Sequence, residues 1–157
     1  MKKPAVLFVC LGNICRSPLA EAAFRQEAAK AKLDAEIDSA GIGGWHAGEP
    51  PDRRAQAVAR NHGIDISSYR ARKVTKEDFS RFTYILALDH DNLAALEALR
   101  PEGSNAEVHL LLDYVSGRNG EAVDDPWYGS AADFEVTWSD VLQGAKGLVR
   151  ALVEGCG

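Results

Sequence analysis

The sequence predicts an α/β fold in which a parallel sheet carries helices on both faces. Short apolar runs, typical of buried strands, alternate along the chain with longer segments of helical periodicity. Such alternation favours parallel strands joined by helical crossovers, which place helices against the sheet. With 157 residues, 46% of them apolar, the chain is long enough to bury one core. We therefore expect one domain over residues 1–157.

The first half of the chain supplies two strands and two helices of this pattern. The apolar run 5–9 predicts a buried strand, and the segment 18–32 that follows predicts a helix. A short strand at 36–39 and a helix at 51–61 complete this half.

The second half continues the alternation. We expect a short helix at 76–81, a strand at 83–88, a helix at 90–99, a strand at 108–112, and a long terminal helix from about 131 to 153. The stretches 41–48 and 116–130 are longer than plain connections require. Long loops in compact domains are often functional, so we expect both to contribute to a site.

The turn between the first predicted strand and the first predicted helix is a candidate anion-binding loop. It reads Cys10-Leu11-Gly12-Asn13-Ile14-Cys15-Arg16-Ser17. The first N–H groups of a helix have no intrahelical partner and carry the positive end of the macrodipole, so they bind anions. These groups and the Arg16 guanidinium would also stabilise a thiolate on Cys10. The loop would then hold a phosphate and supply its nucleophile.

Neighbouring strand ends should support this loop. Ligands bind at the carboxyl ends of parallel strands, where Cys10, Ser39 and Asp89 should converge. We expect Asn13 to adopt the left-handed conformation that such a loop requires and to bond Ser39, and Gly12 to serve the same backbone purpose. Ser17 has two interpretations, as the N-cap of the helix or as a hydroxyl donor to the Cys10 thiolate.

The string from Val9 to Pro18 resembles the signature of the low-molecular-weight protein tyrosine phosphatases. Similar segments follow in family order at 38–40, 48–52, 62–64, 75–79 and 125–129, so the resemblance spans nearly the whole chain. It implies a three-layer sandwich whose four-stranded sheet has the order 2-1-3-4, with the phosphate-binding loop after strand 1.

The resemblance implies a hydrolase that acts through a cysteinyl-phosphate. Cys10 would attack the phosphorus, while the planar fork of Arg16 would bind two phosphate oxygens. Asp125, which precedes Pro126, would protonate the leaving oxygen and then activate water, with Asp124 as a rival by adjacency. Asp89 would orient Arg16 or cap the following helix. This chemistry needs no metal and no organic cofactor.

Substrate recognition should come from aromatic side chains in the long loops. Trp45 lies in the first loop, and Trp127 and Tyr128 follow Asp125 in the second. Together they could form a slot for a phenyl ring. The expected partners are therefore phosphotyrosine-containing proteins, with inorganic phosphate or other oxyanions as ligands or inhibitors.

Cys15 has three interpretations: a small buried hydrophobe beneath the loop, a redox partner that forms a disulfide with Cys10, or a metal ligand. Metal binding is the weakest of them, because the chain supplies no cluster of ligands to complete a site. We interpret the dispersed His46, His62, His90 and His109 as ordinary surface or helix-end residues, and Cys156 as incidental.

Charge and hydropathy limit the other partners. The net charge is −5, and the longest basic cluster, 70–73, favours a solvated loop, so we expect no nucleic-acid partner. No apolar run approaches the ~18 residues of a membrane span, and no secretory cleavage pattern is visible. A catalytic thiol also needs a reducing compartment. We expect a cytoplasmic protein that does not bind membranes and is a monomer or self-associates weakly.

Two alternative functions stay open at this point. An arsenate reductase resembles this family in fold and anion loop, but thioredoxin-coupled members carry further cysteines after the third strand, whereas residues 90–112 contain none. A non-catalytic phosphoprotein-binding module would be expected to lose Cys10, Arg16 or Asp125, and all three are present.

Overall fold

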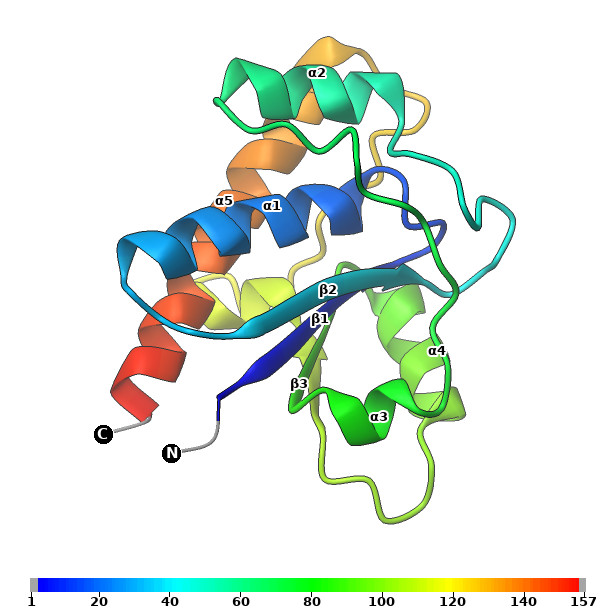
Figure 1. Cartoon of the computed structure of the whole chain (residues 1–157), viewed down its shortest axis with the longest axis vertical. Helices are drawn as coiled ribbons and strands as arrows, with labels where there is room; N and C mark the ends of the chain where they lie inside the picture. The colour runs from blue at the N-terminus through cyan, green and yellow to red at the C-terminus, as the bar shows by residue number, and fades with distance from the viewer. Residues whose placement is uncertain (1–2, 156–157) are drawn as a thin grey trace.

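A four-stranded sheet in the order β2-β1-β3-β4 forms the middle layer of the structure, a computed structural model that describes residues 3–155 (Figure 1). The strands are β1 (Ala5–Cys10), β2 (Glu36–Gly41), β3 (Tyr84–Ala87) and β4 (Glu107–Leu110). All neighbouring pairs are parallel. The predicted fold class and strand order are therefore confirmed.

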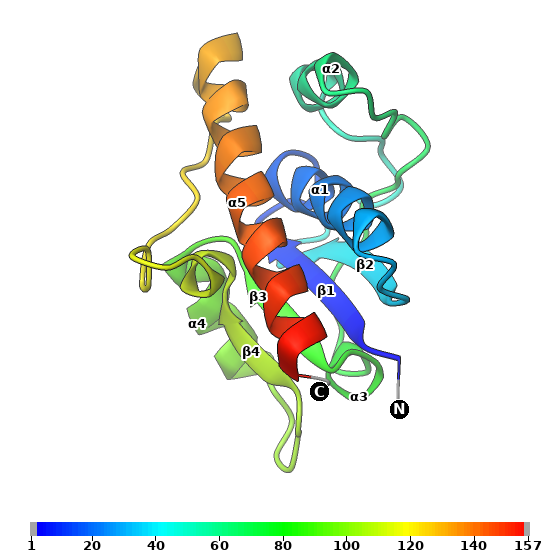
Figure 2. The same cartoon turned by 90° about the vertical axis from the view of Figure 1, so that its left-hand side faces the viewer.

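Helices form the two outer layers. On one side lie α1 (Arg16–Lys30) and α5 (Ala131–Gly155), with α2 (Arg53–Asn61) packed beside them (Figure 2). On the other side lie α3 (Asp78–Arg81) and α4 (His90–Leu99). A short 3-10 helix, η1 (Leu111–Tyr114), follows β4 and packs against α5. Within residues 3–155, none of these helices combines the length and apolar character of a membrane span.

The alternation of side chains along β1 divides the core between the two faces of the sheet. Val6 and Phe8 belong to the cluster that packs with α1 and α5, whereas Leu7 and Val9 belong to the cluster on the α3 and α4 side. Cys10 has the parity of Phe8, so the strand delivers its sulfur to the α1 side. The sheet thus fixes where the thiol emerges.

Several element boundaries differ from the predicted ones. Helix α1 starts at Arg16 rather than at residue 18, because a proline in the first turn forfeits no intrahelical hydrogen bond. Helix α2 starts at Arg53, since Asp52 is its N-cap and accepts from the Arg54 N–H at 2.8 Å. Residues 111–112 were predicted in the fourth strand but lie in η1, because their apolar run signals burial in the α5-side core rather than strand structure.

Candidate active site

A cavity of about 310 Å³ opens at the carboxyl end of β1, where the chain turns into α1. Its walls come from the loop after β1, the loop after β2 and the segment before α5. They comprise Cys10, Leu11, Gly12, Ile14, Cys15, Arg16, Trp45, His46, Asp125, Trp127 and Tyr128. The fold therefore brings the predicted nucleophile, arginine, acid and aromatic side chains into one opening.

The Cys10 sulfur lies at the bottom of this cavity and is almost buried, with 3% of the residue exposed. The Asn13 backbone N–H points at the sulfur with a nitrogen–sulfur distance of 3.3 Å, and the Ser17 hydroxyl lies 3.0 Å away. Asn13 adopts φ 61°, the left-handed conformation expected for it. This turn of the backbone aims the loop N–H at the thiol.

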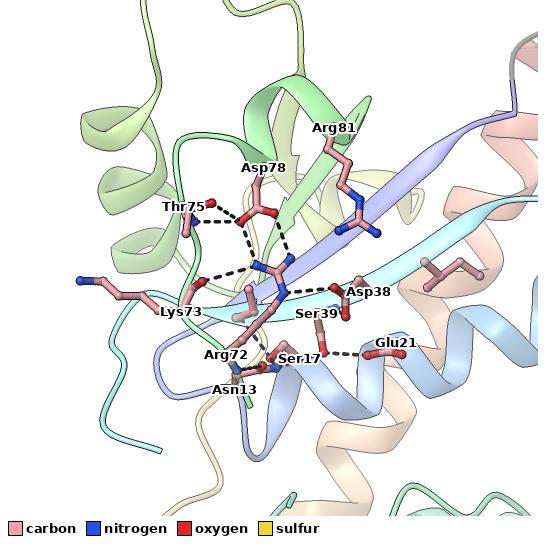
Figure 3. A network of polar contacts seen from close by, with 12 residues as sticks. Asn13, Ser17, Glu21, Asp38, Ser39, Arg72, Lys73, Thr75, Asp78 and Arg81 are labelled. Carbon is pink, nitrogen blue, oxygen red and sulfur yellow. Dashed lines mark hydrogen bonds and ion pairs between the residues drawn. The ribbon is translucent and has the colours of Figure 1, made fainter. Parts of the chain in front are cut away.

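The side chain of Asn13 connects the loop to neighbouring segments through three hydrogen bonds (Figure 3). Its Nδ2 donates to the Oγ atoms of Ser17, at 2.8 Å, and Ser39, at 3.0 Å, while its Oδ1 accepts from the Arg72 backbone N–H at 3.0 Å. Because the Ser17 oxygen accepts from Asn13, its single proton can donate to the Cys10 sulfur at 3.0 Å or, less closely, to the Ala40 carbonyl at 3.5 Å. A hydroxyl that donates to sulfur stabilises a thiolate.

The second branch of the network ends at a buried carboxyl group. The Ser39 hydroxyl accepts from Asn13 and donates to Glu21 Oε1 at 2.7 Å. Burial raises the pKa of Glu21, although hydrogen bonds from Ser39 and Arg25 act in the opposite direction. The role of Glu21 was not predicted, because a glutamate within a helix carries no signal of burial in the sequence.

Arg72 holds the segment that supplies the backbone N–H to Asn13. Its guanidinium lies between the carboxylates of Asp38, at 3.1 Å, and Asp78, at 3.0 and 3.1 Å (Figure 3). The neighbouring Lys73 forms a parallel bridge with Gly41 at the end of β2. The basic cluster 70–73, interpreted as a solvated loop, thus contains Arg72, which supports the anion-binding loop through its hydrogen bond to Asn13.

Arg16 is nearly buried beside the thiol, and part of its guanidinium is already engaged. Its Nη1 donates to Asp89 Oδ2 at 2.7 Å and to the Val123 carbonyl at 2.9 Å, while Nη2 lies 3.8 Å from Asp125 Oδ2. Burial opposes the charge, but Cys10 and the two aspartates outweigh it and raise the pKa of Arg16. Asp89 also caps α4 with its other oxygen, so both expectations for it hold together.

Both adjacent aspartates line a neighbouring hollow, but only Asp125 also lines the cavity that contains Cys10. Asp125 lines the cavity, and its Oδ1 accepts from the Trp127 backbone N–H at 3.1 Å, which fixes the carboxylate in a tight turn. Asp124 lines that hollow and not the cavity that contains Cys10. The geometry therefore favours Asp125 as the acid.

Exposed aromatic side chains surround the mouth of the cavity. Tyr128 is 98% exposed, Trp45 68% and Trp127 39%. The Trp45 indole rests on Gly43, where an added Cβ would lie only 1.8 Å from the ring. These rings lie outside both core clusters and line the cavity that contains the thiol.

His46 was interpreted as an ordinary surface residue, and this was wrong because it lines the cavity. Its Nδ1 lies 3.3 Å from the Glu49 carboxylate, and its ring centroid lies 6.3 Å from that of Trp127. Its position next to Trp45 in a long loop was the available signal. The interpretation of Gly12 was also wrong: it lacks a positive φ, and its role is spatial, since a Cβ there would lie 3.1 Å from the His46 ring.

Cys15 lies in the N-cap position of α1, so Ser17, which is inside the first turn, is not the cap. The Cys15 thiol is buried, and burial, followed by the charge of Asp52, raises its pKa well above its usual range. Among residues 3–155 there is no group of three or more potential ligands that could hold a metal ion. Cys156 lies outside the described residues.

Known proteins match this chain along almost its whole length. Residues 5–155 match the family model described as low molecular weight phosphotyrosine protein phosphatase. A protein of that name from Schizosaccharomyces pombe is 42% identical over 154 residues, which cover 96% of this chain and 98% of the yeast protein.

Solved structures agree with the sequence match. A protein tyrosine phosphatase from Entamoeba histolytica, with Hepes in its active site, has a TM-score of 0.92 at 33% identity and covers 99% of this chain and 100% of its own. A Drosophila arginine phosphatase has a TM-score of 0.87 at 32% identity, covering 94% and 96%. These matches favour an enzyme over a non-catalytic module, and a phosphatase over an arsenate reductase. The resemblance found in the sequence is confirmed: the chain belongs to the low molecular weight phosphotyrosine protein phosphatase family.

Proposed function

We propose that the protein hydrolyses phosphotyrosine in proteins through a cysteinyl-phosphate intermediate. The supporting observation is that one cavity is lined by a buried thiol and a buried arginine from the turn between β1 and α1 and by an aspartate from the distant segment before α5. A phosphate monoester dianion would be bound by the loop N–H groups and by the guanidinium hydrogens of Arg16 that face the cavity. No metal or organic cofactor has a role in this chemistry.

In the first step the Cys10 thiolate attacks phosphorus in line with the leaving oxygen. The S–P bond forms as the P–O bond to the phenol breaks, and Asp125 gives its proton to the phenolate oxygen. A tyrosyl oxygen has a conjugate-acid pKa of roughly 10, so this proton is needed at neutral pH. The hydrogen bond from Ser17 stabilises the thiolate both before attack and when it leaves again.

In the second step water attacks the phosphorus of the intermediate. Asp125, now a carboxylate, takes a proton from that water while the S–P bond breaks, which returns the thiolate and releases inorganic phosphate. The same carboxyl group thus alternates between acid and base. Inorganic phosphate and other oxyanions should inhibit, because they occupy the site of the product.

The aromatic walls support phosphotyrosine as the substrate class. Trp45, Trp127 and Tyr128 line the cavity together with the apolar Leu11 and Ile14. A phenyl ring between these walls gains stacking contacts that the short side chain of phosphoserine cannot reach. The structural match to an arginine phosphatase makes phosphoarginine the informative competitor in a substrate assay.

The test is a series of aryl phosphates whose phenols range from acidic to basic. Wild type should depend little on phenol basicity, whereas Asp125→Asn should slow steeply as the phenol becomes more basic, losing ~10² to 10⁴ in kcat for a tyrosine-like leaving group. Asp124→Asn is the matched control and should be mild. Equal slopes for wild type and Asp125→Asn would remove Asp125 from the mechanism.

Two further measurements test the nucleophile and the substrate. Cys10→Ser should abolish turnover but still bind phosphate or vanadate weakly, and near-normal kcat would refute the assignment. Truncation of Trp45 or Trp127 should raise KM for phosphotyrosine peptides by the equivalent of ~0.5 to 1.5 kcal/mol. A similar kcat/KM for phosphoserine or phosphoarginine peptides would contradict the proposed specificity.

A further inference from the structure

We propose that Arg54 and Asp52 form a bracket that positions the loop carrying Asp125 over the phosphate-binding loop. The inference rests on the proposed function, because it takes Asp125 as the acid. Neither residue lines the cavity. Both would therefore act on the reaction through the segments they hold, as positioning residues.

The first end of the bracket is attached to the phosphate-binding loop. The Asp52 backbone N–H donates to the Ile14 carbonyl, with a nitrogen–oxygen distance of 2.8 Å. The Asp52 carboxylate then accepts from Arg54 Nε at 3.1 Å and from Nη2 at 3.2 Å. Burial opposes the charge of this carboxylate, but the bonds from Arg54 prevail and lower the pKa of Asp52. The pair is thus an ion pair anchored on loop backbone.

The other end is attached to the segment that carries the acid. Arg54 Nη1 donates to the Trp127 carbonyl at 2.9 Å and, less closely, to the Gly129 carbonyl at 3.4 Å. The guanidinium carbon also lies 5.5 Å from the Trp127 ring centroid and 4.7 Å from that of Phe134. One planar group is therefore held by a carboxylate, two carbonyls and two aromatic faces.

The path from the bracket to the acid is short. Trp127 accepts from Arg54 with its carbonyl and donates to Asp125 Oδ1 with its N–H. The two groups lie in the adjacent peptide units on either side of the Trp127 Cα, so by holding the carbonyl Arg54 restrains the N–H that orients Asp125 through the backbone dihedrals of Trp127. A carboxyl group that misses the leaving oxygen by about 1 Å can cost ~10² in rate, so this attachment should matter for catalysis.

A purely structural role for Arg54 makes a different prediction. Capping of α2 uses the Asp52 side chain and the Arg54 backbone N–H, which any residue at position 54 retains. Truncation of the Arg54 side chain therefore leaves the cap in place. Arg53 is one residue earlier and exposed, and its side chain makes none of the hydrogen bonds or ion pairs found within residues 3–155, so Arg53→Ala is a matched control.

The experiment measures kcat across the aryl phosphate series for wild type, Arg54→Ala, Arg53→Ala, Asp125→Asn and the double variant of Arg54 and Asp125. We expect Arg54→Ala to lose about 10- to 100-fold with the most basic phenol and little with a nitrophenyl ester. The double variant should be no slower than Asp125→Asn alone, because the arginine acts through the aspartate. Arg53→Ala should follow wild type.

Arg54→Lys provides a second variant if the alanine variant folds poorly. An ammonium group keeps the charge but cannot bond the carboxylate and both carbonyls in one plane, so the same leaving-group pattern should appear at smaller size. A loss of equal size across the series, or additive losses in the double variant, would overturn the bracket. If Asp125→Asn left the slope unchanged, the acid assignment would fail and the bracket with it; if only Arg54→Ala left it unchanged, the bracket alone would be wrong.

Discussion

Replacing Arg16 by lysine tests whether the planar fork, and not the charge alone, binds the transferring phosphoryl group. A guanidinium has five N–H donors, and two of them, both on Nη1, are directed to Asp89 and to the Val123 carbonyl. Three N–H groups, on Nη2 and Nε, make none of the hydrogen bonds found within residues 3–155, so as many as three donors are left for a phosphate. An ammonium has three donors in all, so if it keeps the two internal bonds, one donor is left for phosphate.

The expected loss follows from this count. Removing one preorganised donor to a developing oxyanion costs about 10² to 10³ in kcat, so the loss of two donors would cost at least ~10⁴ if their effects multiplied. The retained positive charge offsets part of that loss. We therefore expect Arg16→Lys to lower kcat by ~10² to 10⁴, with a smaller effect on the binding of inorganic phosphate, since ground-state binding relies more on charge.

The assay compares kcat, KM and phosphate inhibition in wild type and Arg16→Lys with phosphotyrosine peptides. Arg100→Lys is the matched control, because Arg100 also donates from one nitrogen to two carbonyls, those of Ser104 and Ala106, but lies away from the cavity. A kcat for Arg16→Lys within about threefold of wild type would refute the donor count. Thermal unfolding of both variants separates this result from a loss of structure.

Three further predictions concern redox chemistry, pH and packing. Mild peroxide should inactivate the enzyme reversibly with a Cys10–Cys15 crosslink detectable by mass spectrometry, and sulfinate on Cys10 with Cys15 free would contradict this. Because burial raises the pKa of Glu21, its contribution to the free energy of unfolding is largest at acid pH and falls as the pH rises through that pKa. In urea unfolding, Glu21→Gln should therefore gain stability relative to wild type as the pH rises above the ordinary glutamate pKa of about 4.3, and a constant difference would contradict the assignment. Gly147→Ala would place a Cβ 2.0 Å from the Tyr114 carbonyl oxygen of η1 and should lower the free energy of unfolding by ~1 to 3 kcal/mol. Gly155→Ala is the control, because its Cβ would meet open space, and it should be neutral or slightly stabilising. Equal effects of the two substitutions would show that the contact at Gly147 relaxes freely.

The fold was largely predictable because its signals are local. Apolar runs and helical periodicity lie within each element, and the strand order followed from the family resemblance. Boundaries were less accurate where one signal serves two structures. The apolar residues 111–112 lie in η1, because burial in the core is common to a strand and to a buried turn. The strand pattern predicts Cys10 at the end of the first strand, but only the structure shows that the alternation of side chains along β1 directs the sulfur toward α1.

The candidate site was predictable where the residue type itself carries the chemistry. Elsewhere in the site the prediction was incomplete. The cysteine and arginine of the loop and the aspartate of the segment before α5 are chemically distinctive, and the left-handed Asn13 has a known backbone preference. Asp89 was ambiguous because two interpretations competed, yet a carboxylate has two oxygens and serves both. His46 and Glu21 were missed because their roles arise from the loops and strands that fold around them.

A common physical reason explains the remaining omissions. Several contacts that hold this site have a side chain on one side and a backbone group on the other: Asn13 accepts from the N–H of Arg72, Arg16 donates to the carbonyl of Val123, and Arg54 to that of Trp127. Every residue carries a backbone carbonyl, so such a partner leaves no mark in its own residue type. It follows that substitutions of the Val123 side chain should affect Arg16 only through packing, while substitutions of Arg16 leave a buried carbonyl without its donor. The site is therefore more sensitive to change at the side-chain end of each contact than at the backbone end.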